Sequence, residues 1–188
     1  SRDWSSDVCS SDLDIPKREE PFRSGTGMAE KIDFSKVRFL IVDNNSLSAQ
    51  MIEDILRMLG TTSLRRASDS AKAKAALREG DIDIVITERE LEPESGIQLV
   101  DYIRHSAESL DRLMPVIMLT ARSESEYVTE ARDKGVTEFL AKPFTVDSLY
   151  RRIASVIARP RAFVNSPQYF GPDRRRRQQA YSGPNRRS

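Results

Sequence analysis

The fold is decided by the stretch Phe39-Leu40-Ile41-Val42-Asp43-Asn44, in which four apolar residues run directly into a polar pair. Continuous apolar runs of this kind are typical of parallel strands that are covered on both faces. Similar runs recur along the chain, and the one that contains two arginines is expected at the edge of the sheet. The expected strands are residues 39–42, 63–67, 82–87, 116–120 and 138–141.

Segments with the 3.6-residue period of amphipathic helices lie between these strands. The first should place Leu47, Met51, Ile55 and Leu59 on one face and end at Gly60. The other helices are expected at residues 70–79, around Ile97, Val100 and Ile103, from a capping box of Ser123 and Glu126 to near Gly135, and, after Thr145 as N-cap, through Val146, Leu149, Ile153 and Val156. Five alternating strand–helix units predict a doubly wound α/β domain, for which the flavodoxin-like strand order 2-1-3-4-5 is the natural choice.

The predicted domain spans residues 37–158, and the segments before it differ in character. Residues 1–13 resemble the in-frame translation of a sequencing-library adapter and lack the features of a signal peptide, so they are excluded from functional reasoning. We expect residues 14–36 to be a disordered leader, with the true start at Met28. The single cysteine, Cys9, lies in the excluded segment. A chain without other cysteines, a signal or a long apolar run is expected in the cytoplasm.

Residues 159–188 are predicted to form a basic disordered tail, because eight arginines, one aspartate and few aliphatic residues cannot build a core. Within the tail, Tyr169-Phe-Gly-Pro-Asp-Arg-Arg175 is followed by Tyr181-Ser-Gly-Pro-Asn-Arg-Arg187. Two copies of Tyr-x-Gly-Pro-Asx-Arg-Arg indicate a linear recognition element that is too short to be a structural repeat. A merely solubilising tail is an equally weighted interpretation. The candidate binding residues are Tyr169, Arg174, Arg175, Tyr181, Arg186 and Arg187, and the expected ligand is an acidic partner, of which nucleic acid is one.

Polar side chains follow the carboxyl ends of the predicted strands, where functional groups of open α/β sheets collect. Asp43 and Asn44 follow the first strand, Glu88 the third, Thr120 ends the fourth and Lys142 follows the fifth. Two acids, an amide, a hydroxyl and a lysine converging on one crevice would suit a metal and an anionic group.

Four motifs together resemble the bacterial response-regulator receiver (CheY-like) family over residues 37–158. They are Ile-Val-Asp-Asn at 41–44, Gly96 eight residues after Glu88, Leu-Thr-Ala at 119–121 and Ala-Lys-Pro-Phe at 141–144. The resemblance implies that an acidic pair after the first strand binds Mg²⁺ and that an aspartate at position 88 is phosphorylated. It also implies that Thr120 and Lys142 contact the phosphoryl group and that Phe139 rotates inward as the domain switches.

The departures from the family pattern concern the chemistry of the site. The acceptor position holds Glu88, the metal pair is Asp43 with Asn44, and Glu92 stands in the usual place of a proline. Replacing one acid by an amide weakens a site for Mg²⁺, which prefers anionic oxygens, so Mg²⁺ binding is expected to be weak or absent. Glu88 either mimics a phosphorylated residue or marks a decayed site in which it pairs with Lys142.

These observations predict an atypical, stand-alone receiver (a pseudo-receiver) in two-component signal transduction. It would contact signalling proteins, a histidine kinase or a downstream target, through a face made by the fourth helix, fifth strand and fifth helix (residues 124–158), without aspartyl phosphorylation and without membrane contact. The alternatives are a Mg²⁺-dependent phosphorelay receiver with an unusual acceptor and a nucleic-acid-associated regulator that uses the tail. No enzymatic activity is expected, because no nucleophile has its own activating base.

Overall fold

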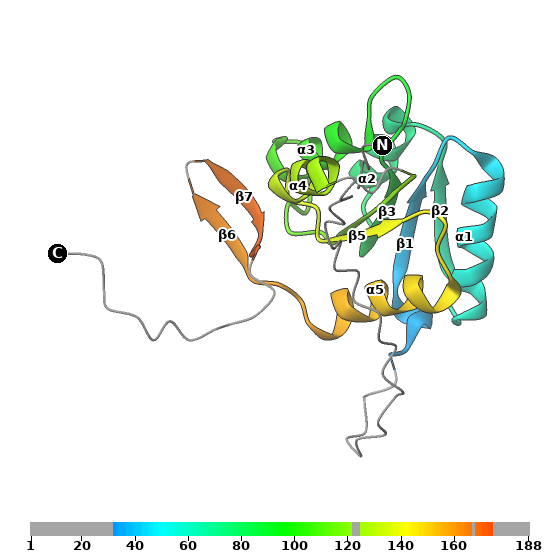
Figure 1. The fold of residues 1–188 in the computed structure, drawn as a ribbon. Helices are drawn as coiled ribbons and strands as arrows, with labels where there is room; N and C mark the ends of the chain where they lie inside the picture. Colours follow the sequence, from blue (N-terminus) through cyan, green and yellow to red (C-terminus); the bar gives the residue numbers. More distant parts are fainter. Residues whose placement is uncertain (1–31, 122–124, 167, 175–188) are drawn as a thin grey trace, which may run out of the picture. The chain divides into compact units, whose positions relative to one another are not determined.

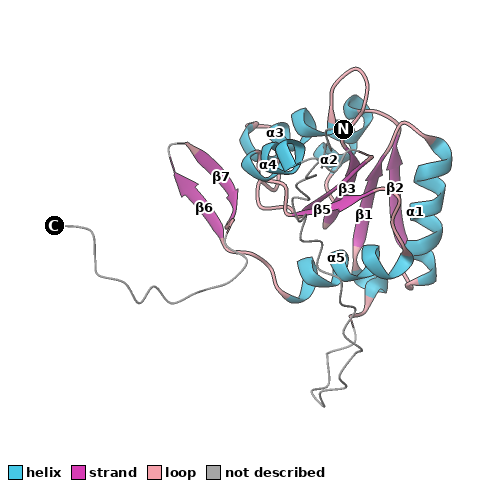
Figure 2. Cartoon of the chain, in the orientation of Figure 1, coloured by secondary structure: helices cyan, strands magenta, loops and turns pink. Residues whose placement is uncertain are grey.

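The computed structural model describes residues 32–121, 125–166 and 168–174. Five parallel strands form one sheet in the order β2-β1-β3-β4-β5, as the sequence predicted, and helices cover both faces (Figure 1, Figure 2). The strands are β1 (Arg38–Val42), β2 (Ser63–Ala67), β3 (Ile84–Glu88), β4 (Val116–Thr120) and β5 (Glu138–Ala141). The helices are a 3-10 turn η1 (Phe34–Lys36), α1 (Ser46–Met58), α2 (Ser70–Glu79), α3 (Gly96–His105), α4 (Ser125–Asp133) and α5 (Val146–Ala158).

Two apolar cores, one on each face of the sheet, hold these layers together. The core under α1 and α5 contains Ile52 and Leu149, and the core under α2, α3 and α4 contains Ala73, Leu99 and Ala131. Strands β3 and β4 are buried along their whole length, whereas β2 is partly exposed. The arginine-containing strand is therefore an edge strand, as expected. Among the described residues, none of the helices has the length and apolar character needed to cross a membrane.

Side chains before the helices fix where several of them begin. Asn45 caps α1 and Asp69 caps α2. Capping boxes start α3 at Ser95 and α5 at Thr145, and the latter confirms the N-cap expected from the sequence. The box expected from Ser123 and Glu126 involves residues outside the described side chains.

The apolar face of α1 differs from the expected one. Leu47 is 80% exposed and Met51 is 45% exposed, although Ile55 is buried as predicted. The sheet is instead contacted by the row that includes Ile52 and Leu56, both fully buried. A spacing of four residues drifts around a helix with 3.6 residues per turn, so the 47–51–55 row leaves the sheet at its amino-terminal end.

The expectation of a disordered segment from Arg159 onward is wrong for part of its length. Strands β6 (Phe163–Ser166) and β7 (Tyr169–Pro172) form an antiparallel hairpin after α5. The prediction of disorder relied on the small number of aliphatic residues. It did not consider that the segment can pack on the rest of the domain instead of forming a core of its own. Phe163 and Phe170 pack against each other and against arginines of the α/β domain, with the guanidinium of Arg104 5.1 Å from the Phe163 ring and that of Arg112 4.3 Å from the Phe170 ring.

The first copy of the duplicated motif is strand β7 and the residues that follow it. Tyr169 donates its hydroxyl hydrogen bond to the carbonyl of Pro172 at 2.7 Å, and the guanidinium of Arg174 lies 4.0 Å from the Tyr169 ring. A side chain on Gly171 would meet the Tyr169 hydroxyl at 2.5 Å and the Cα of Gly135 at 2.8 Å. The motif is therefore a compact local structure that requires glycine at its third position.

Candidate functional site

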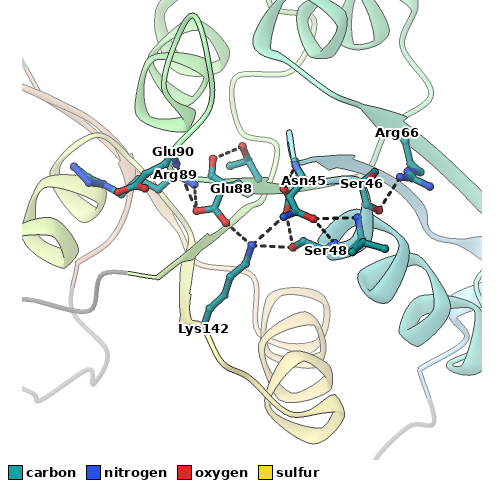
Figure 3. Close-up of polar contacts among 11 residues, drawn as sticks. Asn45, Ser46, Ser48, Arg66, Glu88, Arg89, Glu90 and Lys142 are labelled. Atoms are coloured by element: carbon teal, nitrogen blue, oxygen red, sulfur yellow. Dashed lines mark hydrogen bonds and ion pairs between the residues drawn. The ribbon is translucent and has the colours of Figure 1, made fainter.

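Three charged side chains gather at the carboxyl ends of the strands, as the sequence predicted from their positions. Asp43 directly follows β1, Glu88 ends β3 and Lys142 directly follows β5 (Figure 3). In the parallel sheet β1 lies directly beside β3, and β4 lies between β3 and β5. Asp43 and Glu88 are buried, with 4% and 8% of their surfaces exposed.

Lys142 is the centre of this arrangement. Its ammonium group forms an ion pair with Glu88 Oε2, lies 3.2 Å from Asp43 Oδ2 and donates to Ser48 Oγ at 2.9 Å. Figure 3 shows the end of the lysine side chain between Glu88 and Ser48, with a dashed line to each. The peptide group of Lys142 is also fixed, because its N–H donates to the carbonyl of Thr120 at 2.7 Å.

Asp43 is held by the start of α1. Its Oδ1 accepts from the N–H of Asn45 at 2.8 Å, and its Oδ2 accepts from Ser48 Oγ at 2.5 Å. The sequence reading missed Ser48, which contacts both Asp43 and Lys142. The available signal was its position in the first turn of a helix that begins three residues after Asp43, since such a side chain is directed back toward the preceding turn.

Glu88 is fixed at both carboxylate oxygens. Oε2 pairs with Lys142, and Oε1 accepts from the N–H of Arg89 at 2.9 Å. The start of α3 packs tightly on this strand end, since a Cβ on Gly96 would lie 2.1 Å from the carbonyl oxygen of Glu88. This close approach is a physical reason for glycine eight residues after the acceptor position.

The other expected site residues lie around this cluster in different ways. Thr120 is fully buried at the end of β4, next to β5. Phe139 lies in β5, half-buried, and packs against the core under α4. Asn44 is exposed, and within the described part of the chain it makes no hydrogen bond to Asp43, Glu88 or Lys142. Its neighbour Asn45 has the defined role, as the cap of α1.

The electrostatics of the cluster favour a charged lysine. Burial by itself lowers the pKa of Lys142, but the hydrogen bond and charge of Glu88, followed by those of Asp43, outweigh burial and raise this pKa above its ordinary value. A cation between two buried carboxylates also relieves their mutual repulsion. The three side chains therefore form a partly buried ion triad with one net negative charge.

The donor set does not fit the Mg²⁺ ion that the resemblance implies. Mg²⁺ demands near-octahedral oxygen ligation at about 2.1 Å. Both oxygens of Asp43 already accept hydrogen bonds, and Lys142 places an ammonium group beside each carboxylate. In the parts of the chain that the structure describes, no group of three acidic, histidine or cysteine residues could hold a metal.

The expected tail-binding residues fall into two sets. Tyr169 and Arg174 belong to the hairpin, where Arg174 also lies 3.3 Å from Asp133 of α4. Arg175, Tyr181, Arg186 and Arg187 lie outside the described residues. Two of the three candidate residues of the first copy are thus engaged within the hairpin or with α4, which the sequence did not predict.

Comparisons with known proteins agree with this fold. The family model of the response regulator receiver domain matches residues 39–154. CheY-3 of Vibrio cholerae is 32% identical over 130 residues, covering 69% of this chain and 98% of the relative. CheY of Pseudomonas aeruginosa is 32% identical over 123 residues, covering 65% and 98%. The crystal structure of Vibrio cholerae CheY4 superposes with a TM-score of 0.59 at 25% identity, covering 64% of this chain and 98% of that one.

Proposed function

The chain belongs to the response-regulator receiver family, and we propose that it acts in two-component signal transduction through protein–protein contacts, independently of aspartyl phosphorylation. The observation that carries this proposal is the Glu88–Lys142 ion pair at the acceptor position. The protein would act in the cytoplasm as a binding protein rather than as an enzyme.

The ion pair supports independence from phosphorylation for a chemical reason. An acceptor carboxylate must present one oxygen to the phosphorus atom, and the developing charge needs nearby cations. In this site one Glu88 oxygen pairs with Lys142 and the other accepts from Arg89 N–H. The lysine that the family resemblance assigns to the phosphoryl group is thus already neutralised by the residue at the acceptor position.

The same contact gives Glu88 some of the properties of a phosphorylated residue. Its carboxylate is one methylene farther from the backbone than that of aspartate, and it holds Lys142 from the end of β3. It brings one negative charge, whereas a phosphoryl group brings about 1.5–2 charges and three acceptor oxygens. Glu88 would therefore favour the signalling-competent arrangement to a limited extent without any donor.

The partner surface in this proposal is the face formed by α4, β5 and α5. A groove of about 390 Å³ beside α4 and β5 is lined by Val128, Val136 and Phe139, and by Arg161 and Arg174 of the C-terminal segment. Apolar side chains beside arginines are suited to a protein partner. A signalling protein, either a kinase or a downstream target, is the class of partner we propose here.

The test is phosphotransfer on the full-length chain with acetyl phosphate and Mg²⁺, followed by intact-mass measurement. The wild-type protein is expected to gain no phosphoryl group. The double variant Asn44→Asp/Glu88→Asp, which supplies an acidic pair and an aspartate acceptor, is expected to become phosphorylated and serves as the positive control.

An acyl phosphate mapped to Glu88 of the wild type would contradict the proposal and favour a Mg²⁺-dependent relay with an unusual acceptor. The nucleic-acid alternative has a separate test, because its binding should weaken steeply with salt and disappear when the chain is truncated at Arg159. The structure offers it limited support, since Tyr169 and Arg174 are already engaged within the hairpin and with Asp133.

A further inference from the structure

Helix α4 is less firmly anchored in the core than the other helices. Of its described side chains only that of Ala131 is fully buried, whereas α3 buries six residues and α1 buries four. A helix with so little apolar burial depends on polar contacts for its position. Those contacts therefore decide how α4 is placed on the proposed partner face.

Arg89, the residue directly after Glu88, makes such a contact from the edge of the site. Its Nη2 lies 2.5 Å from Glu130 Oε2, and its guanidinium lies 4.4 Å from the centre of the Tyr127 ring. Both partners are on α4. The Arg89 side chain is only 14% exposed, whereas that of Glu130 is 48% exposed, so the arginine end of these contacts is the shielded one.

The backbone from which this side chain projects is held by Glu88. The carboxylate Oε1 of Glu88 accepts from Arg89 N–H at 2.9 Å and from Glu90 N–H at 3.4 Å. Figure 3 shows Glu88 connected to Lys142 on one side and to the peptide groups of Arg89 and Glu90 on the other. A change in the position or charge of the Glu88 carboxylate would therefore first alter the hydrogen bonds to the peptide groups of Arg89 and Glu90. Its effect on α4 would follow through the Arg89 side chain.

We propose that Arg89 is a positioning residue. It transmits a change in the position or charge of the Glu88 carboxylate to α4. The inference rests on the proposed function in that α4 forms part of the partner face. Its physical content is a short chain of contacts: Lys142 to Glu88, the Glu88 carboxylate to the Arg89 peptide, and the Arg89 guanidinium to Tyr127 and Glu130. The Nε of Arg89 is buried without an acceptor among the described residues, so the guanidinium is placed by these α4 contacts rather than by full hydrogen bonding.

The experiment is hydrogen exchange on the full-length chain, read for the amides of residues 127–133. Arg89→Met is expected to speed their exchange by about five- to tenfold, the effect of losing a shielded cation–π contact and an ion pair. Arg89→Lys, which keeps the charge, should recover part of the protection. Arg66→Met, at a half-exposed arginine of the edge strand, is the matched control and should leave α4 unchanged.

Coupling, as opposed to a purely structural role, is tested by combining Arg89→Met with Glu88→Gln. Glu88→Gln alone should speed α4 exchange by a smaller factor, and Arg89→Met should then add less than it does in the wild type. Unchanged exchange of the α4 amides in Arg89→Met would overturn the inference. So would a double variant whose increase in exchange rate equals the product of the increases in the two single variants. The phosphotransfer test does not depend on this result, so failure of one proposal is distinguishable from failure of the other.

Discussion

A partly buried and a fully buried cation lie at opposite ends of the same parallel sheet, and their surroundings differ. Lys142, at the carboxyl ends of the strands, is paired with the carboxylates of Glu88 and Asp43. Arg104, at the end of α3, is fully buried, and among the described residues its hydrogen bonds go to carbonyl oxygens alone, those of Arg112, Met114 and Gly135, at 2.8–3.1 Å. Two of these carbonyls precede the amino ends of β4 and β5.

The pKa values of the two cations shift in opposite directions. Burial lowers the pKa of Arg104 to about 10, which still leaves the guanidinium charged at neutral pH. The pKa of Lys142 is raised because the hydrogen bond and charges of its carboxylate partners outweigh burial. The comparison teaches that a buried arginine can serve as a structural connector through carbonyl groups, whereas a lysine between carboxylates creates a site whose state depends on protonation and charge.

The largest expected effect concerns Arg104. Arg104→Met leaves the buried carbonyl groups of Met114 and Gly135, and the partly buried one of Arg112, without this donor. It also removes the cation beside Phe163, so we expect the free energy of unfolding to fall by about 3–5 kcal/mol. Urea denaturation followed by circular dichroism would measure this. Arg57→Met, at an exposed arginine paired with Glu53, is the control and should cost at most about 0.5 kcal/mol. Equal losses of unfolding free energy in the two variants would show that Arg104 contributes no more to stability than an exposed arginine does.

A smaller loss is expected at the site. Lys142→Met leaves the carboxylates of Asp43 and Glu88 close together without their cation, so we expect a loss of about 1–3 kcal/mol at neutral pH. Urea denaturation of both proteins at neutral pH tests this; an unchanged free energy of unfolding would show that the two acids do not repel each other.

The hairpin provides a comparison between the two copies of the motif. Gly171→Ala should lower the unfolding free energy by about 1 kcal/mol, because the added methyl group meets Tyr169 and Gly135 and the loss is limited by undocking of the hairpin. Gly183→Ala changes the same position of the second copy and is the matched control. Thermal unfolding of both variants would test whether the first copy stabilises the domain more than the second copy does. Equal shifts in Tm would show that the two copies do not differ in this respect.

The smallest expected effect is seen at alkaline pH. Because the pKa of Lys142 is raised in the folded state, its stabilising contribution is complete below the ordinary lysine value of 10.5 and is lost as the pH rises through the higher folded value. The stability difference between wild type and Lys142→Met should therefore narrow above that pH. Using this difference removes every contribution to the pH dependence that the two proteins share. A difference that widens would contradict the assignment of the shift to the carboxylate partners.

Much of the fold followed from local patterns. The apolar runs located all five sheet strands to within two residues, and β2 was expected at the edge because of Arg65 and Arg66. The burial of α1 was less predictable, because Leu47 and Met51 fit an apolar row as well as Ile52 and Leu56 do. Only the position of the helix on the sheet selects between two rows that differ by one residue.

The candidate site was predictable as a set of residues but not as a set of contacts. Asp43, Glu88 and Lys142 meet because parallel strands place their carboxyl ends at one edge, a consequence of topology alone. The contacts of Ser48 and Arg89 depend on where α1 and α4 lie against that edge. Arg104 gave no signal at all, since its burial requires carbonyl groups that are eight to thirty-one residues away in the sequence.

The sequence by itself determined the α/β class, the strand order expected from its motifs and the substitution of glutamate at the acceptor position, because these depend on residue type and short-range periodicity. The tertiary structure decided that Glu88 binds Lys142, that Arg89 reaches α4 and that the first tail motif folds onto the domain. The physical reason is that each of these contacts joins segments distant in the chain. Their formation depends on distance and burial, which only the packed fold supplies.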